Sequence, residues 1–342
     1  MESIIRTTEP AGGWKEALAG AIRDPDELVE LLGLPDGLRE PARLAAARFG
    51  LVVPRGFLAR MERGNPRDPL LAQVLPLGEE LRPAEGFVGD PVGDRAAGRA
   101  PGLLVKYEGR ALLVATGVCA VNCRYCFRRE YPYDEVPAGR EAWRPALDAI
   151  AADPTIREAI LSGGDPLALA DAALERLVAS LARIPHLRLL RVHTRLPIVL
   201  PERVTAALTS ILVSTRLVPW VVVHANHPAE LAGDCPAALA RLVDAGIPVL
   251  NQSVLLAGIN DDADTLAALS ERLVELRVTP YYLHQLDPVR GAAHFHVPIE
   301  RGLALVEELR RRLPGYAVPR YVQEVAGESG KVPLDRGTMG GA

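Results

Sequence analysis

Short apolar runs recur along the sequence after residue 105, separated by longer segments in which apolar residues repeat every three or four positions. The runs are rich in Val, Ile and Leu and lie at 110–116, 158–163, 189–194, 219–225, 248–256 and 280–286. Helical spacing occupies 141–152, 171–183, 201–212, 229–245, 262–276 and 298–313. Near-continuous apolar strands that alternate with amphipathic helices are typical of a buried parallel sheet, so the pattern predicts an α/β fold.

Six strand–helix units are too few for a closed eight-stranded barrel, and both an open (β/α)6 barrel and a doubly wound sheet fit the count. Polar side chains at the carboxyl ends of the strands favour the barrel, because barrel enzymes carry their chemistry there. These residues are Ser162, His193, Thr194, Arg195, His224, Asn226 and Gln252. We therefore expect an open (β/α)6 partial TIM barrel.

The residues before the first run have a different pattern. Helices are predicted at 24–34 and 40–50, each with Asp or Pro near its start and Gly at its end, and 86–102 has the Gly and Pro density of a connector. The predicted division is a helical amino-terminal extension and wrapping segment over 1–104, a barrel over 105–315 and a carboxyl-terminal segment over 316–342.

Composition and charge narrow the function classes. Apolar residues make up 49% of the 342 residues, which is typical of a globular protein, and the net charge of −4 gives no basic stripe for nucleic acid. No apolar run reaches the roughly 20 residues that cross a bilayer. The first residues lack the hydrophobic core of a signal peptide, so we expect a cytoplasmic protein.

Three of the four cysteines stand together in "CAVNCRYCFRR", at Cys119, Cys123 and Cys126. A structural zinc site usually takes ligands in two pairs, and no second pair follows. A redox dithiol needs only two thiols. Three thiolates suit an iron–sulfur cluster with one iron left open to a ligand. Cys235, at a predicted helix start, is interpreted as a structural thiol.

The trio, with Tyr125 before its third cysteine, resembles the signature of radical S-adenosylmethionine enzymes, and "LSGGDPL" after the second strand resembles their glycine-rich segment. Further blocks resemble the lysine 2,3-aminomutase family, and in particular its short branch, which makes (R)-β-lysine for modification of elongation factor P. These blocks are "KYEGRALL", "VHTRLPIVLPERVT", "LNQSVLL", "PYYLHQLDPVRGAAHF" and "GESGKVPLD". Fermentative members carry a zinc-binding carboxyl-terminal extension, whereas no Cys or His follows Lys331 here.

The resemblance implies a [4Fe-4S] cluster bound by the three cysteines, with S-adenosylmethionine on the open iron. Reduction of the sulfonium would release a 5′-deoxyadenosyl radical that abstracts hydrogen from the substrate. The implied S-adenosylmethionine contacts are Ser162, Gly163, Gly164, Asp165, His193, Arg195, His224 and Asn226. By itself, a "GGDP" stretch is an ordinary turn between a strand and a helix, and a single His on an apolar strand is more often a core residue.

The resemblance also implies pyridoxal 5′-phosphate, which would hold the amino group of the substrate as an imine so that nitrogen can migrate. Lys331 is the implied Schiff-base lysine, and with its usual pKa of about 10.4 it must lose its proton before it can attack an aldehyde. Without the resemblance, a lysine in a Gly/Ser loop is usually solvated. Other implied contacts of this cofactor are Lys106, Tyr107, Arg110 and Gln252.

Lysine as substrate requires charged groups at both ends of the binding site. The resemblance implies that Arg128 binds the substrate carboxylate, and that Asp287 and Glu324 bind the distant ammonium. Fermentative members have Asp at the Glu324 position, so substrate pose or product handedness can differ. His284, His294 and His296 are interpreted as pocket lining or packing.

The predicted activity is therefore an isomerase, L-lysine 2,3-aminomutase. An electron donor, elongation factor P and its lysyl ligase are the implied partners, together with self-association into a homo-oligomer. An aminomutase acting on arginine or glutamate is one alternative, and an iron–sulfur redox protein is another. The lysine and the two acids favour the aminomutase, because an electron carrier needs neither an aldehyde-binding lysine nor paired carboxylates.

Overall fold

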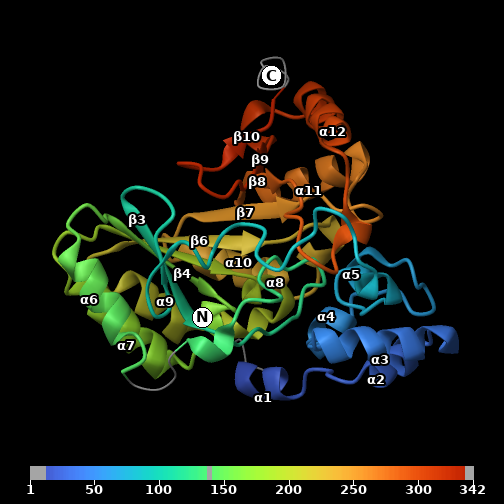
Figure 1. Cartoon of the computed structure of the whole chain (residues 1–342), viewed down its shortest axis with the longest axis horizontal. Coiled ribbons are helices and arrows are strands. Elements are labelled where there is room, and N and C mark those ends of the chain that lie inside the picture. Colours follow the sequence, from blue (N-terminus) through green and yellow to red (C-terminus); the bar gives the residue numbers. More distant parts are fainter. Residues whose placement is uncertain (1–12, 137–140, 336–342) are drawn as a thin grey trace, which may run out of the picture.

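The computed structural model describes residues 13–136 and 141–335, so the first twelve residues, which are predicted not to form a signal peptide, lie outside it. One sheet contains ten strands that lie side by side in chain order (Figure 1). Its centre is parallel and comprises β3 (Arg110–Thr116), β4 (Glu158–Gly163), β5 (Leu189–Thr194), β6 (Val218–His224), β7 (Val249–Val254), β8 (Thr279–His284) and β9 (Arg320–Gln323). Antiparallel strands β1 (Gly98–Ala100), β2 (Leu103–Leu104) and β10 (Val332–Pro333) flank it.

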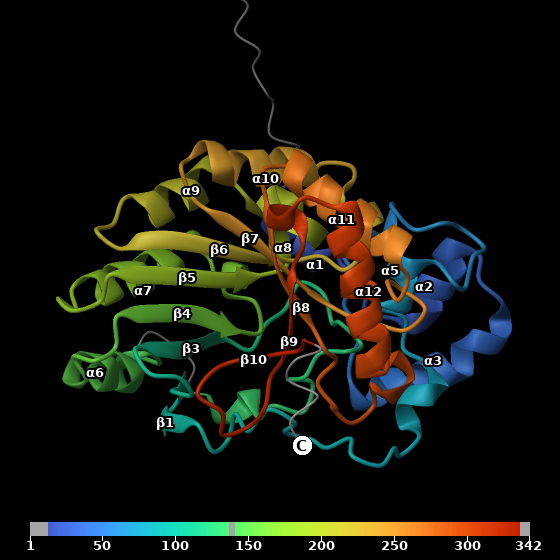
Figure 2. The same ribbon diagram turned by 90° about the horizontal axis from the view of Figure 1, so that it is seen from above.

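The predicted alternation of strands and helices is confirmed, and the helices lie along the outside of the curved sheet (Figure 2). They are α6 (Arg144–Ala152), α7 (Asp171–Ala182), α9 (Ala206–Val213), α10 (Cys235–Asp244), α11 (Ala263–Glu275) and α12 (Ile299–Arg312). Two predicted helices are each divided. A 3-10 turn at Pro201–Arg203 precedes α9, which begins where Thr205 caps the Leu208 N–H, and a second turn at Pro228–Leu231 precedes α10.

The seventh parallel strand, β9, is a finding that the hydrophobic pattern does not predict. It is four residues long and pairs with β8 in the register Tyr282↔Arg320, Leu283↔Tyr321 and His284↔Val322. Such a short run lacks a clear alternation of its own, and the open edge of β8 supplies its hydrogen-bonding partners. This strand carries the chain towards Glu324 and Lys331.

The amino-terminal extension consists of α1 (Trp14–Ala19), α2 (Pro25–Leu32), α3 (Arg39–Arg48), α4 (Arg55–Leu58) and α5 (Pro69–Ala72). The predicted helices at 24–34 and 40–50 are therefore confirmed, and α2 to α5 lie together at one side of the molecule (Figure 1). Asp24 caps the start of α2, and Gly33 ends it with a φ of 64°. Ile22, Leu28 and Phe57 belong to the same buried cluster as the barrel strands, so the extension shares the barrel's core.

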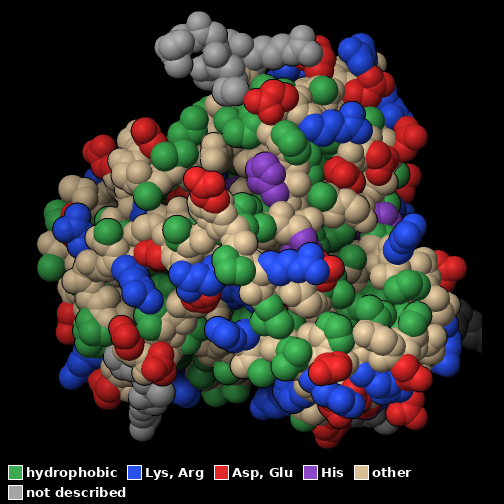
Figure 3. Space-filling model, turned by 45° about the vertical axis from the view of Figure 1, so that its right-hand side comes forward, with side chains coloured by type: hydrophobic (Ala, Val, Ile, Leu, Met, Phe, Trp, Pro, Cys, Tyr) green, Lys and Arg blue, Asp and Glu red, His purple; other side chains and the backbone are tan. Residues whose placement is uncertain are grey.

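The two faces of the sheet differ in polarity. Leu190 and Val192 of β5 belong to the cluster that packs under the helices, whereas Arg191 and His193 point to the other, inner face. The same alternation puts Ser162, His224, Gln252 and His284 on the inner face, so the polar residues of neighbouring strands meet inside the barrel. Within the described ranges, no helix is long and apolar enough to cross a membrane. Acidic and basic side chains are interspersed over the face in Figure 3.

Candidate active site

The three clustered cysteines lie in the loop that follows β3. The backbone N–H of Cys126 donates to the Cys123 carbonyl at 3.0 Å, which curls the loop into a turn. Burial, followed by the charges of the neighbouring thiols, raises the pKa of Cys126 to about 11 and that of Cys119 well above its ordinary value. The thiols are therefore close enough to influence one another's ionisation. Bound iron would favour the thiolate forms.

Buried ion pairs between arginines of the cysteine loop and Glu80 hold this loop in place. Arg124, with no exposed surface, donates to both carboxylate oxygens of Glu80 at 2.8 and 2.7 Å, and Arg129 donates to the same residue at 2.5 Å. Arg124 also donates to the carbonyl groups of Phe49 and Gly50. The amino-terminal extension thus supplies the partners that hold the cysteine loop against the barrel.

The glycine-rich segment at the end of β4 approaches the cysteine loop through its backbone. Gly163 has a φ of 112°, and a Cβ there would lie 2.7 Å from the Thr116 carbonyl oxygen. A Cβ on Gly164 would lie 2.5 Å from the Val118 carbonyl oxygen. Both positions therefore require glycine. Hydrogen bonds of 2.8 Å from Gly164 N–H to Thr116 and from Asp165 N–H to Val118 join the two segments.

Asp165 is buried and bonded within the fold. Its carboxylate accepts hydrogen bonds from the Thr194 hydroxyl at 2.7 Å, from the Arg195 N–H at 2.7 Å and from the Leu167 N–H at 3.0 Å. Burial raises its pKa to about 6 against these bonds. Asp165 therefore positions the end of β5, and through it Arg195. Ser162 accepts a bond of 3.1 Å from Arg128.

Arg195 connects the cysteine loop to a buried polar network. Its Nη1 donates to Cys123 Sγ at 2.7 Å, and its Nη2 donates to Gln73 at 2.6 Å and to Glu230 at 2.8 Å. Glu230 is fully buried, and its pKa is lowered because Arg195 and several hydrogen bonds outweigh burial. The pair therefore stays ionised inside the protein.

His224 and Asn226 belong to the same network. The Tyr125 hydroxyl lies 2.9 Å from His224 Nε2, and Asn226 donates to Tyr125 at 2.7 Å and to Gln73 at 3.0 Å. Burial, followed by the charge of Arg195, lowers the pKa of His224 to about 3, so its imidazole is neutral. The predicted residues of β5 and β6 are thus brought together beside the cysteines.

A second group of charged residues surrounds Lys331. Its Nζ lies 2.5 Å from one oxygen of Glu324, whose other oxygen accepts a hydrogen bond of 2.6 Å from Tyr107 and lies 3.5 Å from Lys106. The Arg110 guanidinium lies over the Tyr107 ring at 4.9 Å. The turn before β3 and the segment after β9 therefore meet, although more than two hundred residues separate them.

Asp94 joins this group to the substrate-binding arginine predicted from the sequence. One oxygen of Asp94 lies 2.7 Å from Lys106 Nζ, and the other accepts a bond of 2.7 Å from Arg128 Nε. The two cations keep the pKa of Asp94 below its ordinary value despite burial. Arg128 Nη2 makes no hydrogen bond to any described residue, so it remains available for a carboxylate.

Several buried polar atoms near Lys331 lack a partner within the described residues: His193 Nε2, His284 Nε2, Asp287 Oδ1 and Arg110 Nε. Burial raises the pKa of Asp287 to about 7, and Lys331 is the largest of the charges that oppose this shift. A buried polar group without a hydrogen bond costs roughly 1–3 kcal/mol, so a cluster of them indicates a place where a ligand binds.

Known proteins resemble this chain over almost its whole length. The L-lysine 2,3-aminomutase of Escherichia coli (strain K12) is 47% identical over 337 residues, covering 98% of each chain, and that of Haemophilus influenzae is 44% identical, covering 97% of each. The enzyme of Clostridium subterminale is 35% identical and matches 94% of this chain but 77% of its own. The chain belongs to the L-lysine 2,3-aminomutase family. No profile of a protein family matches it.

Among solved structures, a radical SAM methyltransferase from Sphaerobacter thermophilus aligns with a TM-score of 0.44 and 21% identity, covering 64% of this chain and 68% of that one. This partial likeness decides nothing about the site.

The residues fit the cofactors that the aminomutase family implies. Each cysteine of a [4Fe-4S] cluster binds its own iron, so the sulfurs stand farther apart than around one ion. Within the described residues, no group of three or more Cys, His, Asp or Glu is already arranged to hold a metal ion. The glycines give S-adenosylmethionine access to backbone groups, and the unpartnered atoms around Lys331 suit pyridoxal phosphate and an amino acid.

Two further predictions concern Gln252 and Cys235. Gln252 lies on the inner face between His224 and Tyr282 in register, but its side chain makes no hydrogen bond to a described residue. Cys235 is buried at the start of α10, as the sequence predicts, away from the cysteine trio.

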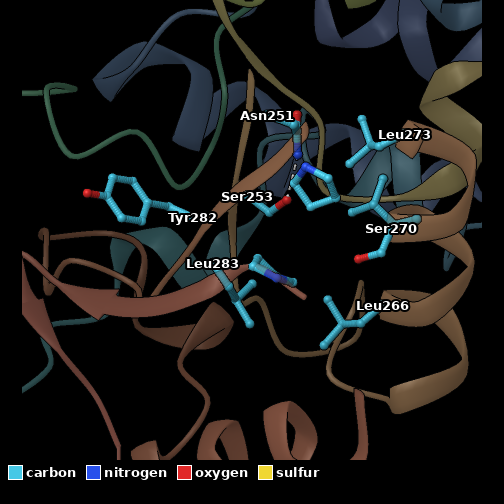
Figure 4. A pocket seen from close by; sticks show the side chains of 10 residues that line it. Asn251, Ser253, Leu266, Ser270, Leu273, Tyr282 and Leu283 are labelled. Carbon is cyan, nitrogen blue, oxygen red and sulfur yellow. Dashed lines mark hydrogen bonds between the residues drawn. The ribbon is translucent and has the colours of Figure 1, made fainter. Parts of the chain in front are cut away.

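The outer side of β7 holds a cavity of a different kind (Figure 4). Asn251 donates to Ser253 at 2.9 Å, and both also bond the Ala225 carbonyl group. Leu266, Leu273 and other apolar side chains line most of the rest, together with Ser270 and Tyr282. Asn251 and Ser253 are hydrogen-bonded within the fold, so the cavity lies in the packing of α11 against the sheet.

Sequence reasoning missed Gln73, Glu80, Asp94 and Glu230, the residues that hold the site residues in place. Gln73 and Glu80 lie in the extension, where no motif marks them, and Asp94 lies in the glycine-rich connector. A weak signal exists for Glu230, since it follows His227 in the predicted strand-end segment and caps the turn that begins there.

Proposed function

We propose that this protein is an L-lysine 2,3-aminomutase that converts L-α-lysine to (R)-β-lysine, and that its product is used to modify elongation factor P. Support for the lysine substrate comes from relatives at 44% and 47% identity over nearly the full chain. The observation that carries the proposal is the arrangement of charges around Lys331. Asp287, whose pKa responds to Lys331, has one oxygen without a partner among the described residues. Ion pairs through Glu324, Lys106 and Asp94 connect the lysine to Arg128.

The protein's own residues would act by binding and orientation. When bound, the cluster with S-adenosylmethionine supplies a hydrogen-abstracting radical, and pyridoxal phosphate supplies the imine chemistry for nitrogen migration. Cys119, Cys123 and Cys126 would hold the cluster, and the backbone at Gly163 and Gly164 would approach the methionyl group.

The contacts of the charged residues suggest how a lysine substrate is held. The free Nη2 of Arg128 suits the substrate carboxylate, and its other nitrogens are fixed by Asp94 and Ser162. Asp287 offers an unpartnered carboxyl oxygen to the distant ammonium. Glu324 pairs with Lys331, so a substrate ammonium would compete with this lysine for the same carboxylate.

Lys331 is placed for the Schiff-base role because it is partly buried and Glu324 holds its Nζ, and the amine would have to give up its proton there before it attacks an aldehyde. Lys106, the other lysine of the group, is held by Asp94 and by the Val92 carbonyl group at 2.8 Å. Lys106, Tyr107, Arg110 and Gln252 would face the phosphate or ring of the cofactor. Lys331→Ala should therefore abolish the visible absorption band of the Schiff base.

The decisive experiment is anaerobic incubation of reconstituted protein with L-lysine, S-adenosylmethionine, pyridoxal phosphate and a reductant, followed by separation of α-lysine from both β-lysine enantiomers. We expect (R)-β-lysine. Turnover of arginine or glutamate instead of lysine would contradict the substrate assignment. Iron binding without turnover of any of the three amino acids would favour a redox protein.

A matched pair of cysteine variants tests the cluster. Cys123→Ala removes one of three ligands and should abolish turnover together with most bound iron and sulfide, measured by chemical assay after anaerobic reconstitution. Cys235→Ala removes the buried thiol of α10 and should retain both. Equal iron contents in the two variants would show that the trio does not hold the cluster.

Further properties are proposed together with the aminomutase activity, and they rest on the resemblance to the family. They are a cytoplasmic location, an electron donor that reduces the cluster, a ligase that transfers β-lysine to elongation factor P, and a homo-oligomer. Product formation on free lysine, compared with elongation factor P already carrying lysine, would identify the physiological substrate.

A further inference from the structure

His284 is the last residue of β8 and faces the interior of the barrel. Leu283 packs into the apolar cluster beneath α12, so its neighbours Tyr282 and His284 point to the opposite, inner face. The His284 side chain is 9% exposed, and its backbone carbonyl accepts a bond from Leu255 at 2.9 Å. Strand pairing therefore fixes the direction in which the imidazole points.

The Nε2 atom of His284 has no hydrogen-bond partner among the described residues. Two other histidines do have partners: His186 Nε2 lies 3.0 Å from the Ile150 carbonyl oxygen, and His224 Nε2 lies 2.9 Å from the Tyr125 hydroxyl. His193 Nε2 and both ring nitrogens of His294 lack a partner among the described residues, as His284 Nε2 does. A histidine buried only for packing would be expected to have such a partner, because an unpaired ring nitrogen is costly away from water.

A chain of contacts connects His284 to Lys331. The Lys331 ammonium lies 5.9 Å from the centre of the Tyr282 ring, and the rings of Tyr282 and His284 meet edge to face at 5.4 Å. Burial, followed by the charge of Lys331, lowers the pKa of His284 well below its ordinary value. The imidazole is therefore neutral and offers one nitrogen beside the lysine without adding a positive charge.

We propose that His284 is a pyridoxal phosphate-binding residue whose Nε2 makes a hydrogen bond to the cofactor held by Lys331. This inference rests on the proposed function, since it requires the cofactor at that lysine. The ligand offers suitable groups, because its phosphate, phenolic oxygen and ring nitrogen all form hydrogen bonds.

The test compares His284→Phe with His284→Gln, which keeps a hydrogen-bonding group, and with His296→Gln, which changes an exposed histidine. The dissociation constant of pyridoxal phosphate is measured by absorption titration of the iron-loaded protein, with wild type and Lys331→Ala as references. We expect His284→Phe to weaken binding about tenfold, and His284→Gln to recover most of it. His296→Gln should bind like wild type.

Iron content and melting temperature establish that each variant is folded. If His284→Phe is unstable, the dissociation constants of His284→Gln and His284→Asn are compared instead. Both variants keep a polar amide, but the amide of asparagine reaches less far than that of glutamine. An unchanged dissociation constant in a folded His284→Phe variant would overturn the role of His284 but not the proposed function. A wild-type protein whose spectrum matches that of Lys331→Ala would instead contradict the proposed function.

Discussion

Individual carboxyl groups of the site differ because their immediate surroundings differ. Glu230 and Asp94 are buried beside arginine or lysine, and their pKa values are lowered. Asp165 is buried with neutral donors, and its pKa rises to about 6. Asp287 has an unpartnered oxygen, and its pKa rises to about 7. Groups that support the fold are therefore paired, whereas the one proposed to meet the substrate ammonium is not.

Asp287 should make lysine binding depend on pH. Below a pKa of about 7 its carboxyl group is protonated and neutral, and above it the carboxylate attracts the substrate ammonium. We expect the KM for lysine to fall as pH rises towards this pKa, by up to about tenfold per pH unit, and then to level off. Steady-state kinetics of the holoenzyme between about pH 6 and 8 measures this.

Asp287→Asn provides the comparison, since asparagine has a similar size but does not titrate in this range. Its KM should be higher by about tenfold to a hundredfold, with this pH dependence absent. A variant that retained the full wild-type slope would assign the titration to another group. Iron content should match wild type, which separates loss of binding from loss of structure.

Among the secondary-structure elements, α12 and β9 pack against each other at very short distance. Gly302 of α12 faces Tyr321 of β9, and a Cβ on this glycine would overlap the tyrosine hydroxyl group. The same hydroxyl donates to the buried side chain of Gln285, which in turn donates to the Val297 carbonyl group at 2.9 Å. The helix thereby fixes the strand that leads to Glu324 and Lys331.

Gly302→Ala should therefore destabilise the protein by about 1–3 kcal/mol, because the added methyl group displaces Tyr321 from its hydrogen bond. Urea denaturation measures the change in the free energy of unfolding. Gly315→Ala is the matched control, since no heavy atom lies within 4 Å of its added Cβ. Equal stabilities for the two variants would mean that the sheet accommodates the methyl group without loss.

At the scale of the whole molecule, the site depends on contacts between distant parts of the chain. Gln73, at the end of α5, is fully buried and accepts hydrogen bonds from Tyr125, Asn226 and Arg195 while donating to Glu230. The ten-stranded sheet likewise extends from β1 and β2, which follow the extension's helices, to β9 and β10 at its other edge. The extension is thus part of the barrel's structure.

Gln73→Ala should lower the free energy of unfolding by about 2–4 kcal/mol, because it removes a partner from several buried polar groups at once. Gln323→Ala, on β9, is the control and should change stability by less than about 1 kcal/mol, since no hydrogen bond of that side chain to a described residue is lost. Chemical denaturation measures both. A neutral Gln73→Ala would show that solvent replaces these bonds.

The sequence by itself determined the alternating strands and helices from 110 to 313, because hydrophobic periodicity is a local property that each segment carries. It also marked the cysteine trio, the glycine-rich segment and the lysine through short motifs. It did not determine β9, since four residues become a strand only when the edge of β8 supplies hydrogen bonds.

Only the tertiary structure decided which charges are satisfied. Gln73, Glu80, Asp94 and Glu230 come from four separate segments, and their pairing with Arg195, Arg124, Arg128 and their neighbours depends on distances that no local pattern contains. The same is true of His284 and Asp287, whose unpartnered atoms are recognised only once everything around them is placed. Motifs fix which groups are present, whereas burial and long-range contacts fix which of them remain free to bind a ligand.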